Sequence, residues 1–256
     1  TQADVDVCCG YAKHYLPTFK QPEVRMMLSA FAAMEAVHQE AYSLLLETLG
    51  FRDDEYQKFF EHKEMLDKHE YLGNFGMKTP MDIAKTMAIY SGFTEGVQLF
   101  SSFAILLNFP RHNLMKGMGQ IVTWSVRDET LHVEGMSHLF RSFVQENPQL
   151  WTDDLKYEIY CAAERTVELE DAFINLCFEG AEVPDLTAEE IKEYIRYIAD
   201  RRLLGLGLKK IFGSEANPLP WLDYMLNGVE HTNFFENRAT EYSRASTTGN
   251  WQDIFK

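Results

Sequence analysis

Cysteine, basic charge and long apolar runs are all scarce in this chain of 256 residues. Its four cysteines include no C-x-x-C pair, and the adjacent Cys8 and Cys9 are poorly placed for a structural disulfide. No secretory signal peptide opens the sequence, and no run of about 18 uncharged apolar residues could span a membrane. We therefore expect a cytoplasmic protein in a reducing compartment, with no membrane partner.

Lysine and arginine number 24 against 39 aspartates and glutamates, which gives a formal net charge of −15. A nucleic-acid-binding surface needs clustered positive charge to neutralise phosphates, and no basic stripe is visible. We therefore expect no nucleic-acid partner. Solubility alone explains the acidity, or internal carboxylates bind cations, and composition does not distinguish these two interpretations.

Signals for β-strands are nearly absent, and the few prolines stand between long segments with helical periodicity. Pro22 and Gly50 frame the first segment as residues at a helix start and stop do. The expected helical segments are 23–49, 53–71, 80–108, 113–145, 152–179, 187–212 and 219–227. Long helices joined by short turns predict an all-α bundle, with residues 1–231 forming one domain. Residues 232–256 are more polar, and we expect them to follow the surface and lead into a tail missing from the sequence.

Two of the expected helices carry the same pattern, Glu35-Ala-Val-His38 and Glu129-Thr-Leu-His132. A spacing of three places both side chains on one helix face, and carboxylate with imidazole suits a divalent metal ion. One copy alone is weak evidence, because the pattern often arises by chance on a solvated face. Two copies on separate helices, with Glu35 inside an apolar run, indicate a buried metal site, because an unpaired buried carboxylate is costly.

A helical di-metal site also needs one carboxylate from each of two further helices. Glu95 is a candidate, because the sequence around it is almost free of charge and Gly92 and Gly96 would allow close helix approach. The plainer interpretation of Glu95 is an exposed residue at a helix edge. The other carboxylate must precede Pro22, where periodicity does not choose between Asp4 and Asp6.

Tyr42 follows Glu35 by seven residues and His38 by four. Seven residues make almost two helical turns, so Tyr42 shares the face of Glu35, and its rise from His38 is about 6 Å. A phenol there would lie just beyond the metal ligands, where they could oxidise it. A tyrosine on a bundle face is usually a core residue, so position is the only argument at this point.

Together these residues resemble the small subunit of class I ribonucleotide reductase. Glu35-x-x-His38-x-x-x-Tyr42 is similar to one signature of that family, and Arg127-Asp128-Glu129-x-x-His132 is similar to another. The opening Thr1–Asp4, the helix start at Pro22 and the position of Glu95 also fit the family. The resemblance extends from the first residue to about Arg202.

This resemblance implies a ferritin-like helical bundle with additional helices and a di-metal carboxylate site in its core. It implies that one metal ion is bound by Asp4, Glu35 and His38, and the other by Glu95, Glu129 and His132. Glu35 and a second glutamate are able to bridge the two ions. Tyr42 matches the family's radical tyrosine, and Asp128 matches the acid that orients His38 and lies on the radical-transfer route.

The resemblance also implies a function. The reduced metal pair, which we expect to be iron, with manganese or a mixed pair as alternatives, reacts with oxygen or superoxide. The oxidised pair then takes an electron and a proton from Tyr42. A separate large subunit uses the stored oxidising equivalent to reduce ribonucleotides to deoxyribonucleotides. We expect a homodimer that binds this large subunit, and no catalytic cysteine in the present chain.

Two features depart from the family pattern. The N-terminal tryptophan and the C-terminal tyrosine of the family's radical route have no counterpart in this sequence, and we expect that both ends are missing. The apolar shell around the radical tyrosine maps to Leu99, Phe103 and Ser125. Ser125 is polar at a position that is commonly aliphatic.

Three other interpretations compete with this one. Another ferritin-like di-metal oxidase or hydroxylase would share the six ligands, but it would need a substrate channel, and Tyr42 would be incidental. An iron-storing ferritin would be a shorter chain of four helices. A metal-free helical interaction protein would leave Glu95 and both histidine pairs unexplained.

The ligand assignment makes a direct prediction for Glu95→Ala. Because one carboxylate is removed from the proposed set, the purified variant should contain fewer than two metal ions per chain, measured by elemental analysis against the unaltered protein. Full occupancy by two ions would remove Glu95 from the set of ligands.

Overall fold

The computed structural model describes residues 2–52, 58, 61–72, 76–180 and 183–226. All regular secondary structure in these residues is helical, as the sequence predicts. None of the described helices is both long and apolar enough to cross a membrane. The expected surface segment 232–256 lies outside the described residues, so the proposed division of the chain at residue 231 stays a prediction.

The helices follow one another in a simple order along the chain. They are α1 (Gln2–Gly10), η1 (Tyr11–Tyr15), α2 (Leu16–Thr18), α3 (Pro22–Leu49), α5 (Lys63–Leu72), α6 (Pro80–Thr86), η3 (Met87–Thr94), α7 (Phe100–Arg111), α8 (Lys116–Glu146), η4 (Pro148–Leu150), α9 (Asp153–Phe178), α10 (Ala188–Gly205) and α11 (Pro220–Leu226). Of these, η1 and η3 are π-helical and η4 is a 3-10 turn.

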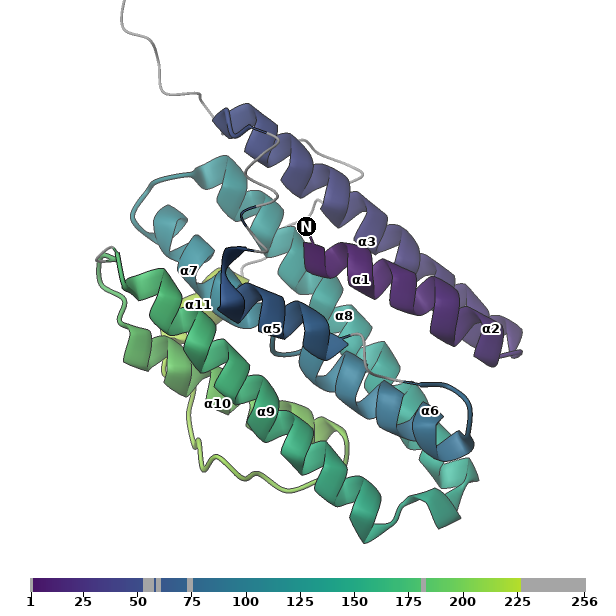
Figure 1. Cartoon of the computed structure of the whole chain (residues 1–256). Coiled ribbons are helices and arrows are strands. Elements are labelled where there is room, and N and C mark those ends of the chain that lie inside the picture. Colours follow the sequence, from purple (N-terminus) through teal and green to yellow (C-terminus); the bar gives the residue numbers. More distant parts are fainter. Residues whose placement is uncertain (1, 53–57, 59–60, 73–75, 181–182, 227–256) are drawn as a thin grey trace, which may run out of the picture.

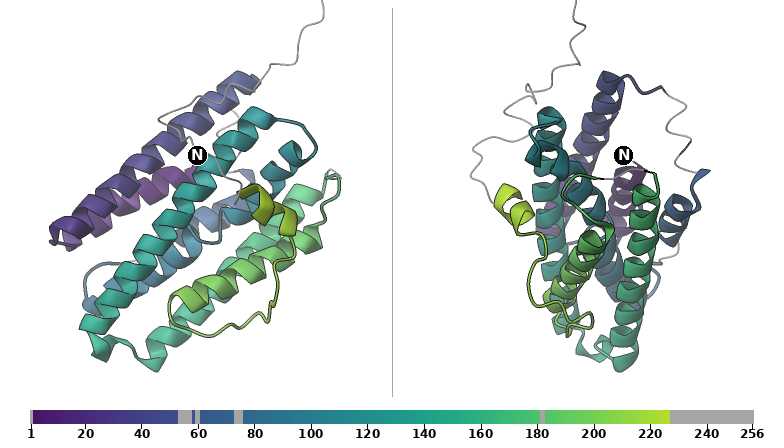
Figure 2. Two further views of the ribbon diagram at one scale, coloured as in Figure 1. Left: turned by 180° about the vertical axis from the view of Figure 1, so that it is seen from behind. Right: turned by 90° about the vertical axis from the view of Figure 1, so that its left-hand side faces the viewer.

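The long helices pack into a bundle around α8. Helices α1 and α3 lie side by side on one flank, and α9 and α10 lie side by side on the other (Figure 1). From behind, α8 runs between these two pairs, where it contacts α3, α7 and η3 (Figure 2). The buried side chains of these helices form a continuous hydrophobic core. A fourth helical segment before Pro22, which the di-metal pattern required, is therefore present as α1 and η1.

The predicted continuous helix 80–108 is wrong. In the structure it consists of α6, the π-helix η3, a turn and α7. Bonds to the fifth preceding residue mark this change, because the Glu95 amide donates to the Tyr90 carbonyl over 3.3 Å and that of Gln98 to the Phe93 carbonyl over 3.0 Å. Such insertions into α-helices are frequent at functional sites, and this one ends at Glu95.

Gly96 makes the irregular backbone possible. A Cβ atom at this position would lie 2.2 Å from the carbonyl oxygen of Gly92 and 2.9 Å from Nε of Arg202. Without a side chain, the Gly96 carbonyl instead accepts a hydrogen bond of 2.9 Å from Nε of Arg202 on α10. The close approach expected at Gly96 is confirmed, although it serves a π-helical turn rather than a straight helix.

Two other expected helix boundaries differ from the structure, the end of α10 and the start of α5. Helix α10 ends at Gly205, seven residues before the predicted end at Phe212, and Gly207 follows with a left-handed φ of 85°. Helix α5 begins at Lys63, and residues 53–57 and 59–60 of its predicted range lie outside the described residues. The segment after α10 is held by Asp200, a fully buried residue of that helix.

Asp200 accepts three backbone hydrogen bonds from this segment. Its Oδ1 accepts from the amides of Ile211 and Phe212 over 2.9 and 3.0 Å, and its Oδ2 accepts from the amide of Ser214 over 3.2 Å. These amides lie beyond the end of α10, so they have no helical carbonyl to bind. The carboxylate of Asp200 is their hydrogen-bond acceptor instead.

Asp200→Ala should therefore lower the free energy of unfolding by about 3 kcal/mol, because three amides lose a charged acceptor. Urea unfolding followed by circular dichroism measures this change. Asp153→Ala, at an exposed residue that pairs with Lys156 on the surface, is the control and should change the midpoint little. Equal midpoints for Asp200→Ala and the control would contradict the structural role of Asp200.

Candidate metal centre

Six metal-binding side chains from four parts of the chain meet in the core of the bundle. They come from α1, from α3, from the turn directly after η3 and from α8. Each is at most 4% exposed: Asp4, Glu35, His38, Glu95, Glu129 and His132. The two Glu-x-x-His pairs face one another across the site, and their histidine rings lie 6.4 Å apart between centroids.

The six side chains form two overlapping groups. In one, ligand atoms of Asp4, Glu35, His38 and Glu129 all lie within 4.8 Å of one another. In the other, the same holds for Glu35, Glu95, Glu129 and His132. Glu35 and Glu129 belong to both groups, so they occupy the positions that could bridge two ions.

Each histidine points its Nδ1 at the carboxylates. Nδ1 of His132 lies 3.0 Å from Oε1 of Glu35, on the neighbouring helix α3. Nδ1 of His38 lies 3.4 Å from Oε1 of Glu129 on α8. The two helices therefore exchange contacts across the site, and both imidazoles present the nitrogen that a metal ion would take.

The outer nitrogens of the two rings have different partners. Nε2 of His38 donates to Oδ2 of Asp128 over 3.1 Å, which fixes the ring and leaves Nδ1 facing the site. Nε2 of His132 lies 3.4 Å from the sulfur of Met34, and the ring of Phe31 packs against it with centroids 4.4 Å apart. Asp128 thus stands where it was expected from the sequence, whereas the outer side of the His132 ring has only apolar or weak contacts.

Several oxygens of the site are buried without a hydrogen bond. Both oxygens of Glu35, both of Glu129 and Oε1 of Glu95 have no partner of this kind. Burying ionised oxygens in this way is costly unless a cation is present. With neutral imidazoles, the four carboxylates carry a formal charge of −4, which two divalent cations would balance. Oxygen and imidazole donors also suit such ions, so the residues fit a metal pair.

The pKa values of the site show strong electrostatic competition. Burial disfavours protonation of His38, but the nearby carboxylates of Asp128, Glu129 and Glu35 outweigh this and raise its pKa to about 12. Burial also disfavours protonation of His132, but Glu129 and Glu35 outweigh this and raise its pKa to about 10. Burial raises the pKa of Glu95 well above its usual value. Without metal ions, the site therefore retains protons at neutral pH.

Asp6, the alternative to Asp4, lies outside the cluster. One of its oxygens lies 2.7 Å from Nδ1 of His69 on α5, while Asp4 belongs to the first group of ligands. The geometry therefore favours Asp4, as the family resemblance implied. Periodicity alone could not make this choice, because both residues are on the same short helix.

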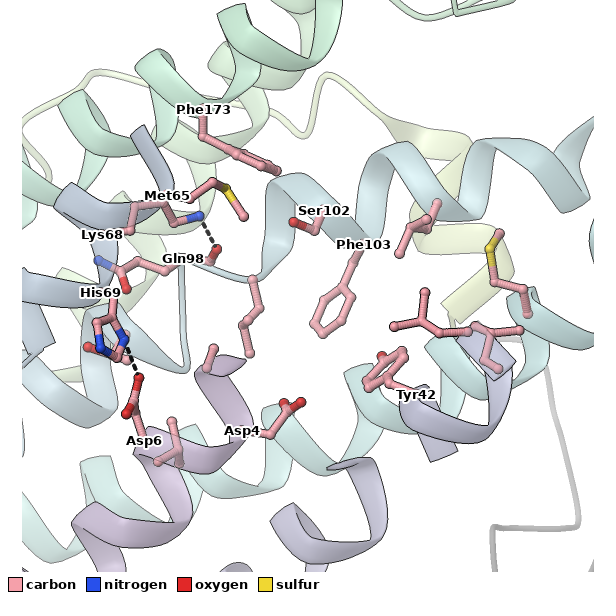
Figure 3. Close-up of a pocket in the computed structure, with 18 of the residues that line it drawn as sticks. Asp4, Asp6, Tyr42, Met65, Lys68, His69, Gln98, Ser102, Phe103 and Phe173 are labelled. Carbon is pink, nitrogen blue, oxygen red and sulfur yellow. Dashed lines mark hydrogen bonds and ion pairs between the residues drawn. The ribbon is translucent and has the colours of Figure 1, made fainter. Parts of the chain in front are cut away.

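Tyr42 lies beside the cluster and at the wall of a cavity. Its hydroxyl donates to Oγ of Ser125 over 2.8 Å. The cavity has a volume of about 650 Å³, and Asp4, Tyr42 and Phe103 all line it (Figure 3). Leu99 lines the same cavity, and Ser125 contacts Tyr42 directly through this hydrogen bond.

A second tyrosine lies at the site and was not predicted from the sequence. Tyr11 is fully buried, and its hydroxyl donates to Oε2 of Glu95 over 2.9 Å. A signal was available, because Tyr11 follows Asp4 by seven residues, the spacing that separates Tyr42 from Glu35. The same reasoning from helical periodicity would have placed Tyr11 near the site.

Taken together, the helical bundle and its buried carboxylates and histidines define a di-metal carboxylate protein. The family described as "Ribonucleotide reductase, small chain" matches residues 1–218. The chain belongs to this family of oxidoreductase subunits.

Individual relatives agree with this membership. The chain is 48% identical to a probable ribonucleoside-diphosphate reductase small subunit of Invertebrate iridescent virus 3, over 98% of this chain and 71% of that protein. It is 32% identical to the ribonucleoside-diphosphate reductase subunit beta of Chlamydia pneumoniae, over 88% of this chain and 68% of that one. This membership supports the reductase interpretation over the alternative di-metal oxidase and the two non-enzymatic ones.

Solved structures share the fold at low sequence identity. The ribonucleotide reductase R2 subunit from Clostridium botulinum has a TM-score of 0.79 and 21% identity, covering 88% of this chain and 74% of that one. A dimanganese(II) NrdF from Streptococcus sanguinis has a TM-score of 0.73 and 21% identity, covering 87% and 78%. The predicted ferritin-like bundle is thereby confirmed.

The raised histidine pKa values predict proton release on metal binding. At pH 7 both histidines of the metal-free protein hold a proton, and a bound ion requires neutral imidazole, so about two protons or more should leave per chain. The apparent affinity for Mn²⁺ should rise with pH, steeply below about 10 and less steeply between about 10 and about 12, because protons held at these two pKa values compete with the ion.

Calorimetry of Mn²⁺ binding in two buffers of different ionisation enthalpy counts these protons. The observed enthalpy should depend strongly on the buffer. His14→Gln, at an exposed histidine of η1, is the control and should release as many protons as the unaltered chain. An enthalpy that is the same in both buffers would show that the histidines are already neutral.

Proposed function

We propose that this chain acts as the small subunit of a ribonucleoside-diphosphate reductase and that its buried cluster holds the two metal ions of that subunit. Asp4, Glu35 and His38 would hold one ion, and Glu95, Glu129 and His132 the other. The observation that carries the proposal is the pair of overlapping ligand groups, which share Glu35 and Glu129 in the core. Iron is the expected metal, with a manganese or mixed pair as alternatives, because oxygen and imidazole donors accept each of them.

When bound, a pair of redox-active ions supplies the one-electron oxidation of a neighbouring phenol. Tyr42 is the phenol that we assign to this step. Burial raises its pKa well above the usual value, so the hydroxyl is neutral and must lose a proton together with the electron. The hydroxyl hydrogen points at Oγ of Ser125, whose own hydroxyl donates to the carbonyl of Ile121 over 3.2 Å.

This arrangement gives Ser125 a definite part in the proposal. Its hydrogen is engaged by a backbone carbonyl, so its oxygen is presented to Tyr42 as an acceptor. The serine that departs from the family's aliphatic pattern therefore orients the phenol rather than leaving an unmatched polar group in the shell.

Asp128 offers a connection from the site toward the surface. Its side chain is 25% exposed, and it accepts a hydrogen bond from His38. We assign it to the route by which the oxidising equivalent leaves Tyr42 for a separate large subunit, where ribonucleotides are reduced. A homodimer, and oxygen or superoxide as the oxidant, complete the proposal, and no cysteine of the present chain is required for it.

Tyr42→Phe tests the assignment of the oxidised residue. After loading with ferrous iron and exposure to oxygen, the unaltered chain should show a tyrosyl doublet by electron paramagnetic resonance, and Tyr42→Phe should lose it. Tyr194→Phe is the matched control, because Tyr194 is a buried tyrosine of α10 outside the cluster. This variant should show the same doublet as the unaltered chain. A normal doublet in Tyr42→Phe would reject Tyr42 as the radical site.

A further inference from the structure

The two carboxylate oxygens of Glu95 have different surroundings. Oε2 accepts the hydrogen bond of 2.9 Å from the Tyr11 hydroxyl. Oε1 is buried and has no hydrogen-bond partner. Glu95 is also a member of the group that contains Glu35, Glu129 and His132. One oxygen is therefore held by the protein, and the other remains available to a cation.

Tyr11 is itself held firmly. Its ring lies 5.7 Å from that of Tyr15, 5.9 Å from that of Phe31 and 6.1 Å from that of His132, measured between centroids. The side chain is 0% exposed. A ring packed on these sides offers its hydroxyl from a fixed position, so the bond to Glu95 restricts where that carboxylate can point.

The neighbouring buried tyrosines use their hydroxyls differently. Tyr15 donates to the backbone carbonyl of Thr86 over 3.3 Å, and Tyr90 donates to that of Asp6 over 2.7 Å. These bonds join helices to one another. The bond of Tyr11 instead ends on a carboxylate of the cluster, which separates its role from general support of the bundle.

We propose that Tyr11 is a positioning residue for the second metal position, and that it fixes Glu95 so that a single oxygen is offered to the ion. The inference rests on the proposed ligand role of Glu95. The backbone gives a reason why such a device is needed here. Glu95 stands at the end of a π-helix, where the hydrogen bond from its backbone amide to the Tyr90 carbonyl is long at 3.3 Å. Regular helical geometry therefore does not by itself orient the residue.

Loss of the hydroxyl should weaken one of the two metal positions. Without Tyr11, Oε2 is buried with no donor, and Glu95 can take up a proton or rotate to offer both oxygens. Partners of metal ligands typically contribute about 10- to 100-fold in affinity. Tyr11→Phe should therefore bind one Mn²⁺ ion about as tightly as the unaltered chain and the second at least about tenfold more weakly.

The experiment follows free Mn²⁺ by electron paramagnetic resonance during titration of the metal-free full chain. Tyr15→Phe is the matched control, because it removes a hydroxyl from an equally buried neighbouring ring and should bind both ions normally. Circular dichroism establishes that each variant is folded. If Tyr11→Phe does not fold, 4-fluorophenylalanine at position 11 fills the same space without donating a hydrogen bond.

A second background shows whether Tyr11 acts through Glu95. Adding Tyr11→Phe to Glu95→Ala should cause no further change in Mn²⁺ binding, because the carboxylate to be oriented is already gone. An equal loss in both backgrounds would overturn the inference and assign the effect to packing against His132. Two tight sites in Tyr11→Phe would also overturn it. Failure of the unaltered chain to bind two ions would instead reject the proposed metal site itself.

Discussion

Mutual repulsion between four buried carboxylates is the constraint on which this structure depends. Glu35, Glu95 and Glu129 come from separate segments and are held within a few ångströms of one another in the core, with Asp4 beside them. Such a cluster is unstable unless positive charge enters it, as protons on the histidines or as metal ions. The bundle must therefore be stable enough through its apolar core to hold these groups together, and the bound cations then contribute stability in return.

The fold meets this constraint by combining regular and irregular helices. Helices α3 and α8 each carry a carboxylate and an imidazole one turn apart, so a straight helix suffices to present them. Three further features position Glu95. They are the π-helix before it, a glycine that Arg202 approaches closely, and a tyrosine that donates a hydrogen bond to one of its oxygens. One of the two described π-helices, η3, thus lies directly before the glutamate that has no histidine on its own turn.

Much of this arrangement could be predicted from the sequence, for reasons that the individual residues make clear. The helical periodicity of 3.6 residues placed Glu35, His38 and Tyr42 on one face, and the same rule placed Glu129 with His132. Periodicity could not separate Asp4 from Asp6, and the family resemblance was needed for that choice. The π-helix η3 was missed, because a bond to the fifth preceding residue has no sequence pattern distinct from that of an α-helix. Asp200 was missed as well, because the loop that it holds is defined only by contacts between separate segments.

The cavity beside Tyr42 gives the two tyrosines of the site unequal access to small molecules. Tyr42 forms part of the wall of a space of about 650 Å³, whereas Tyr11 is 0% exposed. A small reductant that entered this space could quench an oxidised Tyr42 by direct collision, while the hydroxyl of Tyr11 could be reached only after helices separate. The lifetime of any oxidising equivalent held at Tyr42 would then depend on which solutes the cavity admits, as well as on the chemistry of the phenol.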